Sequence, residues 1–328
     1  MKRFFFTLSL LLLFGWQAEA QQEPLFAQYN NNSYLINPAV AGSKGIHSLQ
    51  LFHRWQWVAF PGAPQTFGIN YQGLIGQSHG VGGLIFSDIT GPSRRFGMKG
   101  SYAFHLPVGD DMRLSMGLAG RIVRQRVNTS EITFVDDNDN AINNGSEAVT
   151  TGDAEFGIYF YARNFFVGAS APNLVQSKLD FAGSNATGRD PIGYNYRHYF
   201  VTAGYKFFFD DQEMSLEPSI MLRYTQGPRP QIDGGIKATF LGDQLGFGVF
   251  YRSPGFLSFQ ARFVFDKQMP LLLSFDVATN NFQNYSVGAT EVNFGYDFGG
   301  QPFYGPAGQA GPDIPSLPSS SEDRKGTL

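Results

Sequence analysis

Hydrophobic and polar residues alternate along Met112–Ile122. One set of positions is apolar or small and the other polar or small: Met112, Leu114, Met116, Leu118, Gly120 and Ile122 against Arg113, Ser115, Gly117, Ala119 and Arg121. A period of two residues is typical of a β-strand with two unlike faces. A strand of a soluble sandwich has the same pattern, but a strand that crosses a bilayer needs about 9–11 residues, which this segment supplies. The segment therefore favours the wall of a transmembrane β-barrel, with lipid outside and a polar interior.

From residue 47 onward, fourteen segments have strand character, and the segment described above is one of them. They are 47–57, 65–72, 79–88, 95–105, 112–124, 154–161, 165–171, 197–208, 214–224, 231–240, 244–251, 256–265, 271–277 and 285–298. An even number is expected for a bacterial single-chain barrel. In the last segment the apolar parity changes near Ala289–Thr290, which indicates a bulge or a wrong boundary. The sequence predicts an all-β fold, a transmembrane antiparallel β-barrel of 14 strands over residues 47–298.

The connections between these strands differ in length on the two sides of the barrel. The two long ones, about 125–153 and 172–196, both fall on the odd-to-even side, whereas the even-to-odd connections are all short. Outer-membrane barrels have short periplasmic turns and longer external loops. We therefore expect both long loops outside the cell, and both ends of the chain in the periplasm.

Composition supports a membrane barrel and excludes other classes. Only 16% of the 328 residues are charged, compared with about 25% in ordinary globular domains. Mean hydropathy is −0.18, and no apolar run after the N-terminus is long enough for a membrane-spanning helix. The net charge of −3, without a basic cluster, argues against nucleic acid as a partner. The absence of Cys excludes thiol catalysis, disulfides and thiolate metal sites.

The N-terminus has the features of a cleaved signal peptide over residues 1–20. Lys2 and Arg3 precede the apolar run Phe4–Phe14, and Ala18-Glu19-Ala20 gives the small-x-small cleavage pattern. The alternative, an uncleaved anchor helix, would need a longer apolar run. Export of an aromatic-rich β-protein without cysteine places it in a bacterial outer membrane.

Two further segments lie outside the predicted barrel. Residues 21–46 are rich in Asn but also hold Phe26, Tyr29 and Tyr34, which favours a segment packed on or in the barrel over a solvated leader. Residues 299–328 are rich in Gly, Pro and Ser and are predicted to form a disordered tail.

The charged residues predicted to face the lumen are balanced in sign. They are Lys99, Arg113, Arg121, Lys206, Arg223, Lys237 and Arg262 against Glu155, Glu217, Asp233, Asp276, Glu291 and Asp297. A pore that selects by charge would carry mainly one sign. Balance instead favours ion pairs that brace the wall of a filled interior.

No catalytic, cofactor-binding or metal-binding residues are predicted, and we expect no enzymatic activity. None of the five His has metalloprotease spacing, and no G-x-S-x-G motif occurs. His105 and His198 leave open a membrane-embedded serine hydrolase, for which no triad is visible. Asp136, Asn138, Asn140 and Glu147 have the spacing of a calcium loop, but Ala141 replaces its glycine, so an external acidic loop is favoured.

Several short motifs, in this order and spacing, carry a family resemblance across nearly the whole mature chain. They are Gln28-Tyr29 through Asn37-Pro38-Ala39-Val40-Ala41-Gly42, then Gln56-Trp57-Val58, Gly62-Ala63-Pro64-Gln65-Thr66, Gly83 through Gly91-Pro92, Tyr159-Phe160-Tyr161, Gly168-Ala169-Ser170-Ala171-Pro172, Arg197-His198-Tyr199-Phe200 and Glu291–Phe298. The chain resembles the PorP/SprF family of outer-membrane proteins associated with the type IX secretion system.

The resemblance implies a barrel without enzymatic activity. Such a barrel binds secreted or surface-anchored cargo, including gliding adhesins, through the cargo's C-terminal sorting domain, or links the membrane to periplasmic secretion components. Its other partner is outer-membrane lipid, and the resemblance implies no cofactor. The alternatives are a passive channel for apolar or small solutes, like fatty-acid transporters, and a secreted soluble β-protein. The identity of the cargo does not follow from the sequence.

Overall fold

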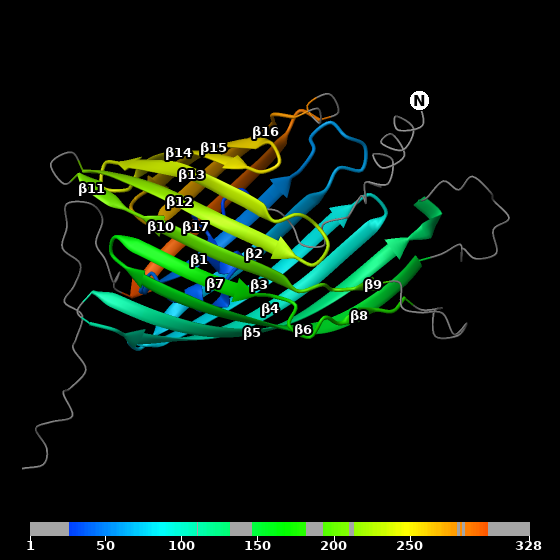
Figure 1. Ribbon diagram of the computed structural model, residues 1–328, viewed down its shortest axis with the longest axis horizontal. Helices are drawn as coiled ribbons and strands as arrows, with labels where there is room; N and C mark the ends of the chain where they lie inside the picture. Colours follow the sequence, from blue (N-terminus) through cyan, green and yellow to red (C-terminus); the bar gives the residue numbers. More distant parts are fainter. Residues whose placement is uncertain are drawn as a thin grey trace, which may run out of the picture.

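The computed structural model describes residues 26–109, 111–131, 146–181, 193–209, 213–280, 283 and 286–300. The wall of the molecule is one antiparallel sheet (Figure 1). Its strands are β1 (Ile46–Trp55), β2 (Gln65–Ile75), β3 (His79–Thr90), β4 (Ser93–Pro107), β5 (Met112–Asn128), β6 (Ser146–Ala162), β7 (Phe165–Ala171), β10 (His198–Tyr205), β11 (Phe207–Phe209), β12 (Met214–Thr225), β13 (Gln231–Phe240), β14 (Leu245–Arg252), β15 (Phe256–Phe265), β16 (Met269–Ala278) and β17 (Ala289–Gly300).

The sheet closes on itself. The first strand, β1, pairs with the last, β17, and β10 pairs with both β7 and β12. The short β11 continues β10 after Lys206 and pairs with the same neighbour, β12, so the two pieces form one interrupted wall strand. The predicted fold class, an antiparallel barrel of fourteen strands, is confirmed.

Most strand boundaries lie close to the predicted ones, and 165–171, 231–240 and 256–265 agree fully. The largest difference is in the β5–β6 hairpin, which continues in register to Asn128 and Ser146, where a loop over 125–153 was predicted. Arg124, Gln125 and Arg126 end the apolar alternation there, although the backbone pairing continues. The last strand begins at Ala289, so the parity change at 289–290 marks a wrong boundary.

The two ends of the barrel are unlike. At one end, here called the long-loop end, lie the described residues of the connections 56–64, 129–145 and 172–197. At the other, the short-turn end, lie 76–78, 163–164, 241–244 and 266–268. The 172–197 connection carries a small hairpin of β8 (Lys178–Leu179) and β9 (Gly193–Tyr194), on the right of Figure 1.

The two faces of the wall differ as a membrane barrel requires. On β5, Leu118 and Ile122 are 61% and 55% exposed, whereas the intervening Ala119 and Arg121 are buried. The outward face is apolar and the inward face holds most of the polar groups. No helix within the described ranges is long and apolar enough to cross a membrane.

The inside of the barrel is occupied by the segment Phe26–Gly45, here called the plug. It contains two short 3-10 helices, η1 (Ser33–Leu35) and η2 (Pro38–Val40). A third, η3 (Thr129–Glu131), lies beyond β5. Figure 1 shows the plug in blue within the surrounding strands. Tyr34, Ala39 and Ala41 are completely buried, so this segment forms the core of the molecule.

Candidate functional site: the plugged lumen

The plug runs along the lumen from the long-loop end to the short-turn end. At its first residue, the carbonyl of Phe26 accepts a hydrogen bond of 3.3 Å from Arg252, the last residue of β14 at the long-loop end. Toward its other end, the carbonyl of Ala41 accepts a bond of 2.8 Å from His105, near the short-turn end of β4. The chain therefore traverses the interior before it enters β1.

The middle of the plug is bonded to the strands of the first half of the chain. Asn32 donates to Asn70 on β2 at 2.8 Å, and Asn37 donates to the carbonyl of Ile158 on β6 at 3.1 Å. Tyr34 bonds Ser101 on β4, Ser115 on β5 donates to Ala39, and Ser170 on β7 donates to Ile36. Because these bonds reach several sides of the lumen, the plug is fixed in position rather than loosely enclosed.

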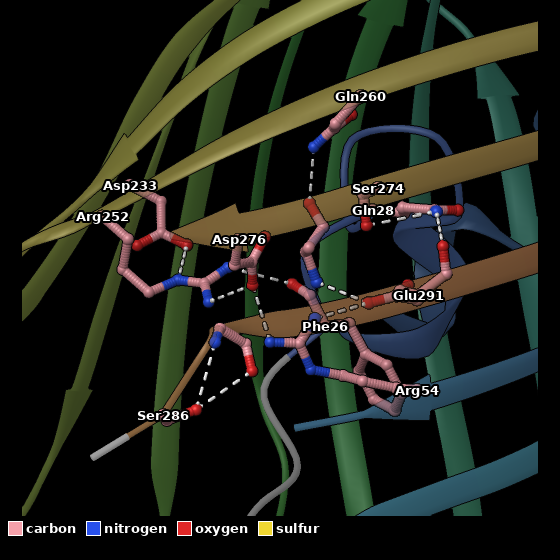
Figure 2. A network of polar contacts seen from close by, with 12 residues as sticks. Phe26, Gln28, Arg54, Asp233, Arg252, Gln260, Ser274, Asp276, Ser286 and Glu291 are labelled. Carbon is pink, nitrogen blue, oxygen red and sulfur yellow. Dashed lines mark hydrogen bonds and ion pairs between the residues drawn. The ribbon is translucent and has the colours of Figure 1, made fainter. Parts of the chain in front are cut away.

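The start of the plug is bonded to the last strands (Figure 2). The amide of Ala27 donates to Glu291 on β17 at 2.8 Å, and Gln260 on β15 donates to the carbonyl of Ala27 at the same distance. Gln28 donates to the backbone carbonyl of Glu291 at 3.1 Å and to Ser274 on β16 at 3.4 Å. Backbone groups buried away from water need such partners, so the wall satisfies the irregular backbone of the plug.

Inward-facing glycines make room for the plug backbone. A Cβ at Gly80 would overlap the carbonyl of Ala41, one at Gly117 would overlap Ala39, and one at Gly157 would overlap the side chain of Asn37. The Asn37-Pro38-Ala39-Val40-Ala41-Gly42 motif thus lies against wall positions that only glycine can fill. At these places the fit between plug and barrel is set by the backbone.

Two apolar clusters complete the packing. Tyr34, Val40 and Ala41 pack with Phe52, Leu84 and other wall residues, and Phe26 meets Phe52 edge-on at 5.4 Å between ring centroids. On the opposite side, Tyr29 and Ile36 pack with Phe200 and Met221. Both clusters therefore join plug residues to side chains of the wall.

A buried charge cluster lies beside the start of the plug at the long-loop end (Figure 2). Arg54 on β1 bridges Asp276 and Glu291 at 2.7 and 3.0 Å, and Arg252 pairs with Asp233 at 2.8 Å. Arg252 also lies 3.7 Å from Asp276, which joins the two pairs. Removing one partner from such a network leaves an uncompensated buried charge, so the cluster holds five wall strands in one arrangement.

A second cluster lies against the middle of the plug. Glu155 on β6 accepts from Lys99 at 3.2 Å and from Arg121 at 3.4 Å. The Lys99 ammonium also lies 4.9 Å from the centre of the Tyr34 ring and donates to the carbonyl of Tyr34. The lysine therefore links the wall to the plug as well as neutralising the carboxylate.

Part of the predicted balance of lumen charges is realised as ion pairs. The structure joins Lys99 and Arg121 to Glu155, and Lys237 to Glu217. It pairs Lys206 with Asp243, and it brings the predicted Asp233, Asp276 and Glu291 to two arginines that were not predicted, Arg54 and Arg252. Arg54 lies at an inward position of β1, so the alternation could have found it. Arg252 lies one residue beyond the predicted end of its strand.

A polar cavity of about 840 Å³ lies beside the plug at the short-turn end. The plug residues Asn30 and Lys44 line it together with residues of the short turns. In one of these turns Asp243 accepts from Lys206 at 2.8 Å and also from Thr239. Burial alone would raise the pKa of Asp243, but Lys206 and these hydrogen bonds outweigh it and lower the pKa below its usual value.

The two histidines considered for catalysis have structural partners. The carbonyl of Ala41 can only accept, so Nε2 of His105 carries a proton and donates, and the hydroxyl of Tyr161 lies 2.9 Å from Nδ1. Nδ1 of His198 lies 3.0 Å from the carbonyl of Tyr196. Of the acidic-loop residues, 136–141 lie outside the described residues, and Glu147 lies on β6. Within the described ranges no group of His, Asp or Glu could hold a metal.

A closed fourteen-strand wall with an apolar outer face and a filled polar lumen defines an outer-membrane β-barrel. The chain matches the model of a family described as type IX secretion system membrane protein PorP/SprF over residues 18–296. It therefore belongs to the PorP/SprF family. The membrane in which it lies is the outer membrane.

The chain is similar to several solved structures. The chain is similar to the CymD monoaromatic hydrocarbon channel, with 12% identity, 83% of this chain and 92% of that one covered, and a TM-score of 0.50. A Pseudomonas aeruginosa FadL homologue (12% identity, 81% and 93% covered, TM-score 0.44) and the P. putida toluene transporter TodX (10%, 81% and 94%, 0.47) are also similar. At 12% identity the likeness to CymD shows the fold alone. No curated protein matches the chain.

Proposed function

We propose that the protein is a non-enzymatic outer-membrane barrel that binds secreted or surface-anchored, adhesin-like cargo, links to periplasmic components of type IX secretion, or does both. The assignment to type IX secretion follows from membership of the PorP/SprF family. The binding role is favoured by a lumen that is filled and braced, because such a barrel offers its two ends, rather than a pore, to other molecules.

The observation that carries the proposal is the bonding of the plug around the wall. Strands β2, β4, β5, β6 and β7 bond its middle, and β14 to β17 bond its start. A passive channel for apolar or small solutes, the alternative function, would need this segment to leave or rearrange. Single-channel recording in planar bilayers separates the two roles: we expect no steady, large conductance, and its appearance would favour the channel.

Each end of the barrel suits a different partner. Barrels of this class place long loops outside the cell, so the hairpin of β8 and β9 faces cargo at the surface. The polar cavity at the short-turn end then faces the periplasm, where Lys44 and the turn residues meet secretion components.

The cargo half of the proposal is tested by removing the hairpin. The amide of Asn195 donates to the carbonyl of Ser177 at 3.0 Å, so residues 178–194 can be replaced by a short Gly-Ser turn without separating their ends. We expect the barrel to fold and a surface protein to appear in the culture medium. The matched control inserts the same turn after Gly227, at the same end of the barrel. An unchanged surface proteome, with the barrel present, would contradict cargo binding by this loop.

A further inference from the structure

The outward wall of the barrel contains an apolar groove that the proposed function does not use. Outward-facing glycines lie side by side on three neighbouring strands, since Gly100 on β4 is in register with Gly83 on β3 and with Gly120 on β5. On β6 the small residue Ala154 is in register with Gly120 and continues the row, and Gly152 lies two positions further toward the long-loop end, opposite Ile122. Three strand spacings make a row about 14 Å long.

The groove is empty of side chains and lined almost entirely by apolar groups. A Cβ at Gly100 or Gly120 would meet nothing within 4 Å. The cavity above these glycines measures about 890 Å³ and is bordered by Ile69, Ile85, Met98 and Ile122 of the wall and by Val175 of the 172–197 connection. Since the groove is part of the lipid-facing surface, water does not fill it, and an unfilled void would lose the contacts of its lining.

The wall beyond the groove, toward the long-loop end, carries positive charge. Along β5, the outward residues after Ile122 are Arg124 and Arg126, and Arg94 on β4 is in register with Arg126. Arg94 lies 3.8 Å from Glu131 in an exposed pair, which is a weak interaction. Arg124 has no ion pair in the described part of the chain, and it lies about 13 Å along the strand from Gly120.

Tyrosines take the outward positions near the long-loop ends of other strands. They are Tyr199 on β10, Tyr224 on β12 and Tyr251 on β14, which are 42%, 46% and 50% exposed. Tyrosines there match the aromatic girdle that barrels place at a membrane interface. Beside the groove, arginines take the place of the aromatic girdle. An apolar groove with arginines next to it, toward the long-loop end, suits a lipid whose headgroup carries phosphate.

We propose that this face binds one anionic, phosphorylated lipid of the surrounding membrane, with an acyl chain in the glycine-floored groove and its phosphate at Arg124 and Arg126. The glycines admit the chain close to the backbone, and the guanidinium groups supply charge-assisted hydrogen bonds to the phosphate oxygens. The occupant is a lipid rather than a soluble anion because the groove lies within the apolar band.

Native mass spectrometry of the full chain in detergent, titrated with lipid A, tests the site. Gly120→Val places a side chain in the open space of the groove. Its control is Gly234→Val, which also faces outward but lies on β13. The double variant Arg124→Gln with Arg126→Gln removes the charge, and the exposed Arg229→Gln is its control. We expect each test variant to weaken lipid A binding about ten-fold, and the controls to bind as the wild type does.

Three results would overturn the assignment. They are unchanged lipid A binding by Gly120→Val, unchanged binding by the arginine double variant, or equal binding of lipid A and phosphatidylcholine by the wild type. Heat-modifiable migration shows whether each variant is folded, and the arginine variant alone decides if Gly120→Val does not fold. The measurement needs no secretion partner, so its outcome is independent of the proposed cargo role.

Discussion

The single residues that matter most in this barrel are buried charged residues. Each needs a partner of opposite charge, because an unpaired charge in the lumen is costly. The sequence predicted most of the inward charges, because alternation assigns a side to every residue of a regular strand, but it missed Arg54 and Arg252. It did not predict which charges meet. Arg54 bonds Asp276 and Glu291 on strands more than two hundred residues away in the chain. Such partners follow from closure of the sheet, which local pattern does not contain.

The cluster around Arg54 gives a stability prediction. Arg54→Met leaves Asp276 with a more distant arginine and Glu291 without its cationic partner, both fully buried. We expect a loss of about 3–5 kcal/mol in the free energy of unfolding, seen as a lower thermal midpoint in detergent. The exposed Arg229→Met is the control and should leave the midpoint unchanged. Equal midpoints for both variants would show that the cluster does not stabilise the wall.

Asp243 gives a pH-dependent prediction at the short-turn end. It has φ of +70°, which Asn also tolerates, so Asp243→Asn removes the charge and keeps the turn. Because folding lowers the pKa of Asp243, its stabilisation is present above the unfolded pKa and is lost as the pH falls through the folded pKa. With the side chain 25% exposed, we expect the variant to lose about 1 kcal/mol at pH 7.

Denaturant titrations across pH test this expectation for Asp243. The stability difference between wild type and D243N should shrink as the solution is acidified below about pH 4. A difference that stays constant with pH would assign the effect to the shape of the turn rather than to the charge.

The elements of the barrel were predicted better than their ends. Strands such as β13 and β15 were placed without error because turn residues bound their apolar alternation on both sides. β5 and β6 extend beyond the predicted boundaries at residues 124 and 154, since backbone pairing needs no apolar side chain once the wall leaves the membrane. The interruption between β10 and β11 at Lys206 leaves no mark in the pattern, because the flanking residues are aromatic on both sides.

β5 supplies a paired test of its two faces. Gly117→Val places a side chain against Ala39, whereas Gly120→Val, three residues on, places it in open space. We expect Gly117→Val to displace the plug and to make single-channel conductance in planar bilayers larger and less steady. Gly120→Val should behave as the wild type does in this recording. If neither variant gave measurable conductance, displacement of the plug would not open a pore through the barrel.

For the whole molecule, connection lengths on the two sides of the barrel give its orientation in the membrane. The chain has no Cys, so single cysteines can be introduced without background. Ser146 at the long-loop end and Gln77 at the short-turn end are both exposed. We expect an impermeant maleimide to label Ser146→Cys on intact cells and Gln77→Cys only after lysis. The reverse pattern would invert the barrel and move the polar cavity to the cell surface.

The lumen is the part that the sequence described least. Its Asn-rich, apolar N-terminal segment was expected on or in the barrel, but the glycines that receive it, Gly80, Gly117 and Gly157, are scattered over three strands. Each is an ordinary glycine in its own strand. Only the register of β3, β5 and β6 brings them to one surface.

The path of the plug has a consequence for the order in which the barrel is assembled. Residues 26–41 are made before any strand, yet their partners Gln260, Ser274 and Glu291 are among the last side chains to be made. Since β1 and β17 form the seam that closes the cylinder, the segment must already lie between the early and the late strands when that seam joins. The plug thus acts as an internal template against which the last strands of the wall pack.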